Sequence, residues 1–343
     1  MLYRLVVIFF LGFLIQYIFR TLLFFGVQKR IYNHRPGECR RVQGPEHGSE
    51  DISLVREKNL AFITSGIVYI PKNSSAINWK GQIFVYDVKK RDYEAIPVPI
   101  KGLDNSVDFH PHGISHFITK TGKIRLFVVV HSKKFEHSVM LLDFDEKSES
   151  LTHYRTIRDE KFTHLTNTLE ILTGYQCGSL VYYDGKNSHT VLDNTIANGI
   201  SLSSDGKTIF VSHINDAKIG VYSWNENKKS VELLSEAEAM SLCDNFHVDE
   251  NGNVWSGCHP IMKDAVGHLG DTSNPNLIAP SQVLRFSFSK DYKSSKIVEV
   301  FADDGNFISA SSIAVNFDNN RQLLIGSVAR QLVHCDIKVP LNF

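Results

Sequence analysis

The chain has 343 residues, with 37 basic and 37 acidic side chains and a formal net charge of zero. This balance lacks the excess positive charge of a nucleic-acid-binding protein, so we expect no nucleic-acid partner. With 43% hydrophobic and 22% charged residues, the composition is typical of a globular protein and excludes a largely disordered chain.

Apolar residues dominate the amino-terminal stretch from Leu5 to Val27, interrupted by Gln16 and Arg20. About 20 such residues are enough to cross a bilayer as a helix. A cleaved signal peptide usually has a shorter apolar core and a cleavage site of small residues, a pattern that we do not find before Lys29. We therefore predict a short tail and an uncleaved transmembrane signal-anchor in residues 1–30. A cleaved signal peptide and a buried soluble helix are the alternatives.

The side of the membrane on which residues 31–343 lie is harder to predict. Five basic residues follow the apolar span closely and one, Arg4, precedes it, which by the positive-inside rule favours the cytoplasm. Large domains are nevertheless translocated largely regardless of charge, and Asn73-Ser74-Ser75 is a glycosylation sequon. We expect a single-pass protein whose large domain is lumenal or extracellular, in the endoplasmic reticulum or at the cell surface, with Asn73 glycosylated.

Beyond the span, the chain consists of short β-rich runs separated by polar turns. Gln82–Val88 and Ile124–His131 are examples of such runs, and Asp205-Gly206-Lys207 is an example of a turn. No long amphipathic helix stands out in this part of the sequence, and Glu232–Leu242 is the fairest helical candidate. The pattern predicts an all-β domain.

A faint internal repeat runs through this domain, each unit having a polar residue, a short strand, a tight turn and a second strand. Its units begin at His112-Gly113-Ile114-Ser115, Asn198-Gly199-Ile200-Ser201 and Asn245-Phe246-His247-Val248. Strand repeats of roughly 40–50 residues are typical of β-propeller blades. The 300 residues from Gly44 to Phe343 therefore predict a six-bladed β-propeller, with a pair of β-sandwiches as the alternative. The 32-residue interval from Thr166 to Asn198 is short for a four-stranded blade.

A propeller brings one point of every blade to its central axis, so a site on the axis should draw polar residues from several repeats. The repeat supplies such a series: Glu50 and Asp51, His112, Thr166 and Asn167, Asn198, and Asp244 and Asn245. Carboxylate and amide oxygens are hard donors suited to calcium. Taken singly, an Asn-Gly or Asp-Asn pair is more often a turn. A shared metal site and a set of unrelated turns are both open at this point.

Several ordered blocks of this sequence resemble the paraoxonase/arylesterase family. They are Gly48-Ser49-Glu50-Asp51, Pro111-His112-Gly113-Ile114-Ser115, Val128-Val129-Val130-His131, Ala197-Asn198-Gly199-Ile200, Asp244-Asn245, Val254-Trp255-Ser256-Gly257-Cys258-His259-Pro260 and Leu323-Leu324-Ile325-Gly326. The resemblance extends from about Cys39 to Cys335. It implies a six-bladed propeller with two calcium ions in its central tunnel, and the apolar anchor is similar to that of the membrane-anchored nematode branch.

The resemblance also implies roles for individual residues. The catalytic calcium would be held by Glu50, Asn198, Asp244 and Asn245, with Thr166 at a fifth ligand position. The structural calcium would be held by Asp51 and the backbone carbonyl of Ile114, with Asn167 at a third position. His112 and His131 match the family's histidine pair, proposed as base and orienter.

The resemblance gives counterparts for three of the five cysteines. Cys39 and Cys335 match the family's disulfide, and Cys258 matches its free cysteine. Cys177 and Cys243 have no counterpart that we can place, and we expect them to be buried thiols.

Two departures from the family bear on function. The family carries Asn-Asp where this chain has Thr166-Asn167, and the lost negative charge predicts a weaker second calcium site. The short interval that follows omits a helical excursion that helps to wall the active site in vertebrate members.

Two functions remain open. The first, which the retained histidine pair and calcium ligands favour, is a membrane-anchored, calcium-dependent hydrolase of aryl esters or lactones. The second is a non-catalytic accessory or chaperone for membrane proteins such as degenerin-type sodium channels, as the resemblance to the nematode branch implies.

Overall fold

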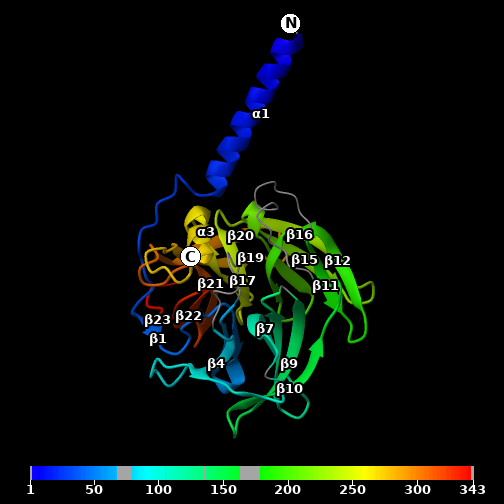
Figure 1. The fold of residues 1–343 in the computed structure, drawn as a ribbon, viewed down its shortest axis with the longest axis vertical. Coiled ribbons are helices and arrows are strands. Elements are labelled where there is room, and N and C mark those ends of the chain that lie inside the picture. The colour runs from blue at the N-terminus through cyan, green and yellow to red at the C-terminus, as the bar shows by residue number, and fades with distance from the viewer. Residues whose placement is uncertain (1, 68–78, 105, 135, 163–177, 341–343) are drawn as a thin grey trace.

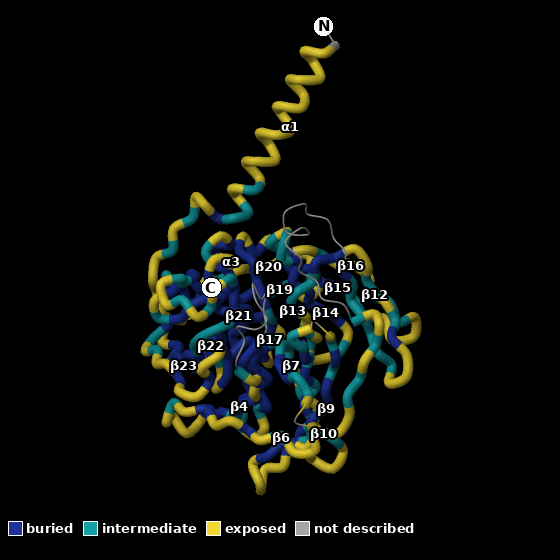
Figure 2. The backbone as a smooth tube through the Cα atoms, viewed as in Figure 1, coloured by how far each residue is buried: buried dark blue, intermediate teal, exposed yellow. Residues whose placement is uncertain are grey.

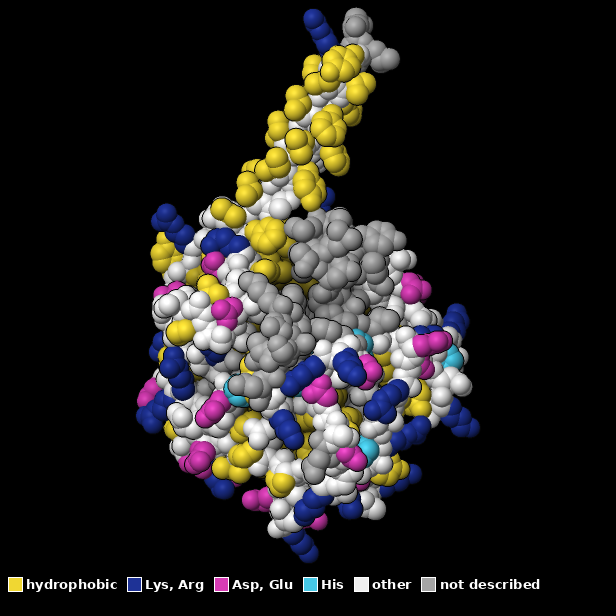
Figure 3. All heavy atoms as spheres, in the orientation of Figure 1, with side chains coloured by type: hydrophobic (Ala, Val, Ile, Leu, Met, Phe, Trp, Pro, Cys, Tyr) yellow, Lys and Arg dark blue, Asp and Glu magenta, His cyan; other side chains and the backbone are white. Residues whose placement is uncertain are grey.

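The computed structural model describes residues 2–67, 79–104, 106–134, 136–162 and 178–340. Helix α1 (Leu2–Phe24) projects away from the β-rich body, and its apolar side chains face outward along its length (Figures 1 and 3). Within the described residues, it is the one helix that is long and apolar enough to cross a membrane. A signal sequence has the same properties, so α1 is a candidate anchor or signal.

The rest of the chain forms antiparallel sheets that follow one another along the sequence (Figure 1). The first sheet contains β2 (Ile52–Val55), β3 (Leu60–Ser65), β4 (Gln82–Asp87) and β5 (Ile96–Pro97). The second contains β7 (His110–Ile118), β8 (Ile124–His131), β9 (His137–Asp145) and β10 (Ser150–Ile157), with β6 (Ile100–Lys101) parallel to β10. The third is the pair β11 (Gly178–Tyr183) and β12 (Ser188–Thr195).

The remaining sheets each have four strands. The fourth contains β13 (Ala197–Leu202), β14 (Thr208–His213), β15 (Lys218–Asn225) and β16 (Ser230–Glu238). The fifth contains β17 (Leu242–Val248), β18 (Val254–His259), β19 (Ser281–Phe288) and β20 (Ser295–Asp303). The last contains β21 (Ser311–Phe317), β22 (Gln322–Ser327), β23 (Leu332–Asp336) and β1 (Cys39–Val42).

The fold is therefore all-β and propeller-like, as predicted, but five full blades are present among the described residues rather than six. The sheet of β11 and β12 has two described strands and occupies the short interval between Thr166 and Asn198. Residues 163–177, directly before β11, lie outside the described residues, and so do Asn73, Thr166, Asn167 and Cys177.

The helix expected at Glu232–Leu242 is not formed. Residues 230–238 instead make β16, which pairs along its length with β15, because the ladder to a neighbouring strand outweighs a weak helical preference. A helix forms later, at α3 (Met262–Gly270), where Met262, Ala265 and Leu269 face a buried apolar cluster.

The carboxy-terminal end of α1 contacts the propeller beside α3. Phe24 and Phe25 pack against the apolar cluster that contains Met262, and the backbone N–H of Lys263 donates to the carbonyl of Phe25 at 3.2 Å. Gly26 has a φ of +68° and lies against Pro260 and Ile261, where a side chain would be strained and crowded. The apolar helix is thus held against the body rather than joined to it by an unattached linker.

The buried residues form a continuous band through the blades (Figure 2), and the two ends of the chain close the ring. β1 pairs antiparallel with β23, with Cys39 directly opposite Cys335, and a disulfide joins the two cysteines as the resemblance implied. The two cysteines are 296 positions apart in sequence, and the bond joins β1, the outermost strand of the last blade, to β23.

We predict that Cys39→Ala lowers the free energy of unfolding by about 4 kcal/mol, because the disulfide restricts a very long loop in the unfolded chain. Chemical denaturation of the full chain in detergent would measure the loss. Cys335→Ala and the double variant should lose the same amount as Cys39→Ala, since each removes the same bond. Losses that add up in the double variant would contradict this origin of the stability.

His334 on β23 is a second buried constraint, with its side chain between two blades. Its Nε2–H donates to Gln322 Oε1 at 2.8 Å, and its Nδ1 accepts from the hydroxyl of Tyr86 at 2.8 Å. Because both ring nitrogens are used in this way, the ring is neutral. Burial first, and then the charge of Arg91, lower the pKa of His334 from 6.5 to about 4.

The native state should therefore lose stability as the pH falls from 6.5 towards 4, because the unfolded chain takes up the proton first. The shift corresponds to about 3 kcal/mol from this one residue. Unfolding midpoints of the wild type and of His334→Gln, measured between pH 7 and pH 4, should show a shallower dependence in the variant. Parallel curves for the two proteins would contradict the prediction.

Candidate functional site

A break in strand register recurs near the start of the innermost strand in four blades. It falls between Pro111 and Ile114 in β7, Ala197 and Ile200 in β13, Cys243 and Phe246 in β17, and Ser311 and Ile313 in β21. Such bulges turn side chains out of the regular alternation of a strand. The residues at these breaks are His112, Asn198, Asp244 with Asn245, and Ser312. Four residues predicted from the repeat, His112, Asn198, Asp244 and Asn245, are therefore placed by bulges of the same kind.

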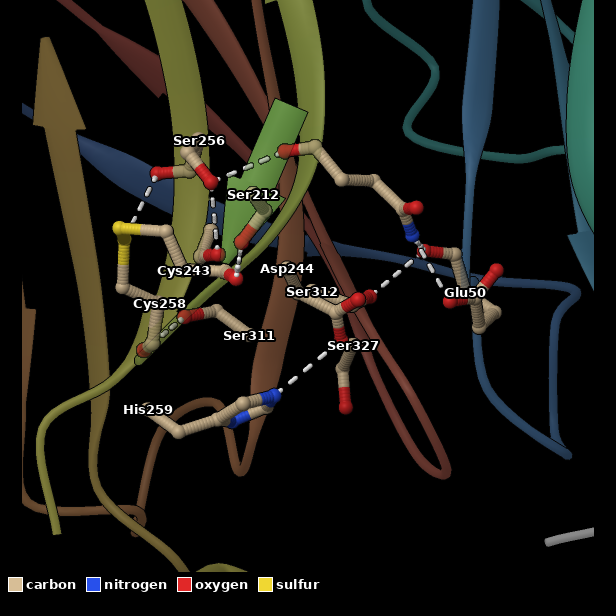
Figure 4. Close-up of polar contacts among 12 residues, drawn as sticks. Glu50, Ser212, Cys243, Asp244, Ser256, Cys258, His259, Ser311, Ser312 and Ser327 are labelled. Atoms are coloured by element: carbon tan, nitrogen blue, oxygen red, sulfur yellow. Dashed lines mark hydrogen bonds and ion pairs between the residues drawn. A yellow bond between two sulfur atoms is a disulfide. The ribbon is translucent and has the colours of Figure 1, made fainter. Parts of the chain in front are cut away.

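Glu50, just before β2, contacts several residues of this group and is drawn with Ser312 and Asp244 in Figure 4; its side chain is 1% exposed. Its backbone carbonyl accepts hydrogen bonds from Ser312 Oγ at 2.6 Å and from Asn245 Nδ2 at 3.2 Å. Its carboxylate Oε1 lies 2.8 Å from Asn245 Nδ2 and 3.1 Å from His112 Nε2. The other oxygen, Oε2, is buried and has no hydrogen-bond partner among the described residues.

Asp244 on β17 is a second buried carboxylate. Its Oδ2 lies 3.2 Å from Nε2 of His259, while its Oδ1 is buried without a hydrogen-bond partner in the described part of the chain (Figure 4). Burial, followed by the charge of Glu50, raises the pKa of Asp244. Gly199 packs directly on the backbone of Asp244 and Asn245 and leaves no room for a Cβ, which places the neighbouring Asn198 beside this pair.

Asp51 is a third buried carboxylate, and both of its oxygens are used. Oδ2 accepts from the backbone N–H of Ile114 at 2.8 Å, and Oδ1 accepts from the N–H of Ile52 at 2.8 Å. Burial and the charge of Glu50 nevertheless raise its pKa to about 8. Asp51 and Ile114 are thus in contact, as their predicted shared site requires, although the metal role of the Ile114 carbonyl stays a prediction.

The two predicted histidines form a hydrogen-bonded pair. His112 Nδ1 lies 2.8 Å from Nε2 of His131, and His112 presents its other nitrogen to Glu50. Burial lowers the pKa of His112, but the charge of Glu50 and the hydrogen bond to it outweigh that effect and raise the pKa to about 9. The carboxylate of Glu50 therefore favours the protonated form of His112.

A third histidine, His137, was missed from the sequence. Its Nδ1 lies 2.7 Å from Nδ1 of His131, since the two residues face each other across the β8–β9 ladder. The signal was available: a short turn between Ile124–His131 and a strand starting near Ser138 puts the flanking residues opposite each other.

The sequence prediction for Cys243 and Cys258 was wrong, because these residues form a disulfide (Figure 4). They lie directly opposite each other on β17 and β18, with their Cα atoms 3.9 Å apart. The residues that follow them are Asp244 and His259, so the bond ties together the two strands that carry this pair. Cys258 matches a free cysteine of the family, and Cys243 has no counterpart that we could place. The resemblance therefore gave no reason to pair them.

The donor set fits a hard cation. The charge of Glu50 acts on both Asp51 and Asp244, and the unpartnered oxygens of Glu50 and Asp244 carry a desolvation cost that a bound cation would remove. No three His, Cys, Asp or Glu side chains in the described ranges converge closely enough to hold a metal by themselves. Amide oxygens from Asn198 and Asn245 would have to complete the set, and such oxygen-rich sets suit calcium. The amide of Asn245 presents its oxygen to the same point if it rotates by half a turn.

Comparisons with known proteins bear on the family of the whole chain. The family model described as Arylesterase matches residues 31–170 and 163–337. Serum paraoxonase/arylesterase 2 of Gallus gallus is 31% identical over 87% of this chain and 88% of its own length. Mechanosensory abnormality protein 6 of Caenorhabditis elegans is 26% identical over 94% of this chain and 92% of its own length.

Among solved structures, a luciferin-regenerating enzyme aligns with a TM-score of 0.54 over 89% of this chain and 100% of its own, at 13% identity. That likeness supports the fold alone. The family-model match covers nearly all of the described propeller, and the identity to the Gallus gallus protein extends over most of both chains. The chain belongs to the paraoxonase/arylesterase family.

Proposed function

We propose that this protein is a membrane-anchored, calcium-dependent hydrolase of aryl esters or lactones. The observation that carries the proposal is the hydrogen-bonded pair His112–His131, which presents His112 Nε2 to a buried cluster of carboxylates with unpartnered oxygens. Attack of water on an ester is assisted by a group that accepts a proton and by a cation beside the carbonyl oxygen. His112 lies next to the proposed cation site and can be that acceptor.

Calcium would be held by Glu50, Asn198, Asp244 and Asn245 and would supply a positive charge that polarises the carbonyl and stabilises the oxyanion. A second ion would be held near Asp51 and Ile114. The chain's own residues would do the rest: His112 takes a proton from water at Nε2, and His131 fixes the orientation of the ring. A bound cation would offset the negative charge of Glu50. Because that charge is the main cause of the raised pKa of His112, the pKa would then fall and the neutral imidazole could accept a proton.

The anchor and the disulfides bear on location. Disulfides persist in oxidising compartments, and the described part of the chain has two, Cys39–Cys335 and Cys243–Cys258. With α1 as a transmembrane anchor, they favour a propeller on the lumenal or extracellular side, which is also the side on which Asn73 could be glycosylated.

A second candidate is a non-catalytic accessory for membrane proteins. It is favoured by the similarity over 94% of this chain to mechanosensory abnormality protein 6, a name that describes no hydrolytic activity. In that case calcium would stabilise the propeller, and an outer surface would bind a client such as a degenerin-type sodium channel.

We predict that the full chain in detergent hydrolyses phenyl acetate or an aliphatic lactone in the presence of calcium, and that a chelator abolishes turnover. Asn245→Ala should lower kcat/KM by about 100-fold, because it removes a donor from the oxyanion-stabilising site. Initial rates would be measured spectrophotometrically with and without added calcium.

Asn187→Ala, in the exposed turn between β11 and β12, is the matched control and should leave the rate unchanged. A folded protein that binds calcium but shows no turnover with either substrate would overturn the hydrolase proposal for these substrates and favour the accessory function.

We further predict that calcium stabilises the chain whichever function holds, since the buried carboxylates repel one another without a cation. At a hundred times the dissociation constant, binding to the native state alone raises the free energy of unfolding by about 2.7 kcal/mol. Thermal unfolding with calcium, magnesium and chelator would measure the effect. Asp244→Asn should weaken the response and Asp205→Asn, in an exposed turn, should keep it. Equal unfolding temperatures with and without calcium would contradict a calcium site.

A further inference from the structure

We propose that a polar pocket at the far end of the innermost strands, remote from the candidate site, binds a single sugar unit through its neighbouring hydroxyl groups. The pocket has a volume of about 180 Å³, and its lining includes Arg56, Glu250, Asn251, Asn316, Asn319 and Asn320. None of these residues belongs to the candidate site, so the proposal does not depend on the hydrolase function.

The pocket is built at the ends of three inner strands whose beginnings build the candidate site. Arg56 follows β2, Glu250 lies in the turn after β17, and Asn316 is the penultimate residue of β21. β21 contacts both β17 and β2, so these three strand ends lie together. From Glu50 to Arg56 the chain advances six positions, which is about 20 Å of extended strand. The pocket is therefore separate from the carboxylate cluster.

The pocket also lies at the end of the propeller away from α1. Helix α3 follows β18, whose last residue, His259, pairs with Leu242 at the start of β17. The end of α1 packs beside α3, whereas the turn that carries Glu250 closes the other end of the β17–β18 hairpin. With α1 as a membrane anchor, the pocket opens away from the bilayer and is accessible to a ligand in the aqueous compartment.

Arg56 supplies hydrogen-bond donors to the pocket. Its guanidinium donates to Nε2 of His247 at 2.6 Å. Burial, followed by the charges of Arg56 and His116, lowers the pKa of His247 to about 3, so the ring of His247 is neutral and accepts this bond. The contact uses one of the five N–H donors of the guanidinium and fixes the orientation of the group.

Asn316 and Glu250 supply acceptors. Asn316 is 2% exposed, and its Nδ2 donates to Oδ1 of Asn320. Its own Oδ1 is buried and has no hydrogen-bond partner among the described residues, which costs free energy unless a donor reaches it. Glu250 is exposed and adds a carboxylate. The lining therefore combines donors and acceptors in a small space.

The two turns that carry this lining are ordered by their own contacts. The carboxylate of Asp249 accepts from the backbone N–H of Asn251 and from Nε1 of Trp255, each at 2.9 Å. Residues 318–320 have successive φ angles of 52°, 53° and 62°, a left-handed conformation that Asp and Asn adopt more readily than most residues. Arg321 donates to Oδ1 of Asp318 at 3.0 Å. The pocket is thus largely preformed.

This mixture of groups selects a neutral ligand that both donates and accepts. An anion offers only acceptors, so it would be repelled by Glu250 and would leave Asn316 Oδ1 unpaired. A cation would be repelled by Arg56. A hydroxyl group donates one hydrogen bond and accepts others, and adjacent hydroxyls can pair with an amide, a carboxylate or a guanidinium. The volume is below the roughly 300–1,000 Å³ of sites for drug-sized ligands, which suits one sugar ring.

The experiment is saturation-transfer-difference nuclear magnetic resonance on the full chain in a detergent without a sugar headgroup. The probes are mannose, glucose, galactose and their methyl glycosides. At least one of them should give a saturable signal. Glu250→Ala should weaken its affinity about tenfold, because a hydrogen bond to a charged group is lost. Asn316→Leu, which has a similar shape, should also weaken it. Glu160→Ala, at an exposed glutamate in another turn, is the matched control and should keep the affinity.

Two results would support the site and separate its sources of ligand. A methyl glycoside that binds as tightly as the free sugar indicates the terminal unit of a glycan, and binding of the free sugar alone indicates a soluble monosaccharide. Absence of a signal from every probe with folded protein would overturn the proposal, and so would unchanged affinity in Glu250→Ala. Displacement of the sugar by inorganic phosphate, lost in Arg56→Gln, would overturn it in favour of an anion site.

Folding of each variant would be checked by thermal unfolding. Because Glu250 is exposed, Glu250→Ala tests the pocket even where Asn316→Leu fails to fold.

Discussion

The site depends on one buried carboxylate, that of Glu50, and on the ring of blades that surrounds it. Glu50, two residues before β2 of the first blade, is held by Ser312 from the last blade, Asn245 from the fifth sheet and His112 from the second. Removing a charge from water costs several kcal/mol unless hydrogen bonds or a counter-charge replace the water. These contacts come from segments up to 262 positions apart, so Glu50 can be satisfied only when the propeller is closed. Closure by β1 and its disulfide is therefore a condition for the site and not only for stability.

The bulges explain how regular blades supply an irregular site. A strand that kept perfect register would direct alternate residues to one face, and adjacent residues such as Asp244 and Asn245 could not both serve the centre. The breaks in β7, β13, β17 and β21 remove this limit at the same level in four blades. Gly199 lets β13 approach β17, and Gly257 lets β18 approach β21, within the space that a side chain would occupy. The sequence repeat at His112, Asn198 and Asn245 coincides with three of these bulges.

Much of this architecture could be predicted from the sequence, and the reasons for the exceptions are physical. Turn residues and apolar runs predicted strands, and the family blocks predicted that Glu50, His112, His131 and Asp244 belong to one site. The helix expected at Glu232–Leu242 was wrong because pairing with β15 is a property of the tertiary structure. Cys243–Cys258 and His131–His137 share one cause: each pair lies opposite across a ladder, and register is set by the turn between the strands. Family comparison does not reveal a contact between two residues that the family does not share.

The two candidate functions make different demands on these residues. A calcium ion that only stabilises a docking module accounts for Glu50, Asp51 and Asp244, because it balances their charge, and for the disulfide that fixes the strand of Asp244. It gives no reason for the hydrogen-bonded imidazoles of His112 and His131 beside Glu50. Such a pair has a use where a proton is taken up from water beside a bound ester. The histidines, more than the carboxylates, are therefore the feature of this propeller that favours catalysis.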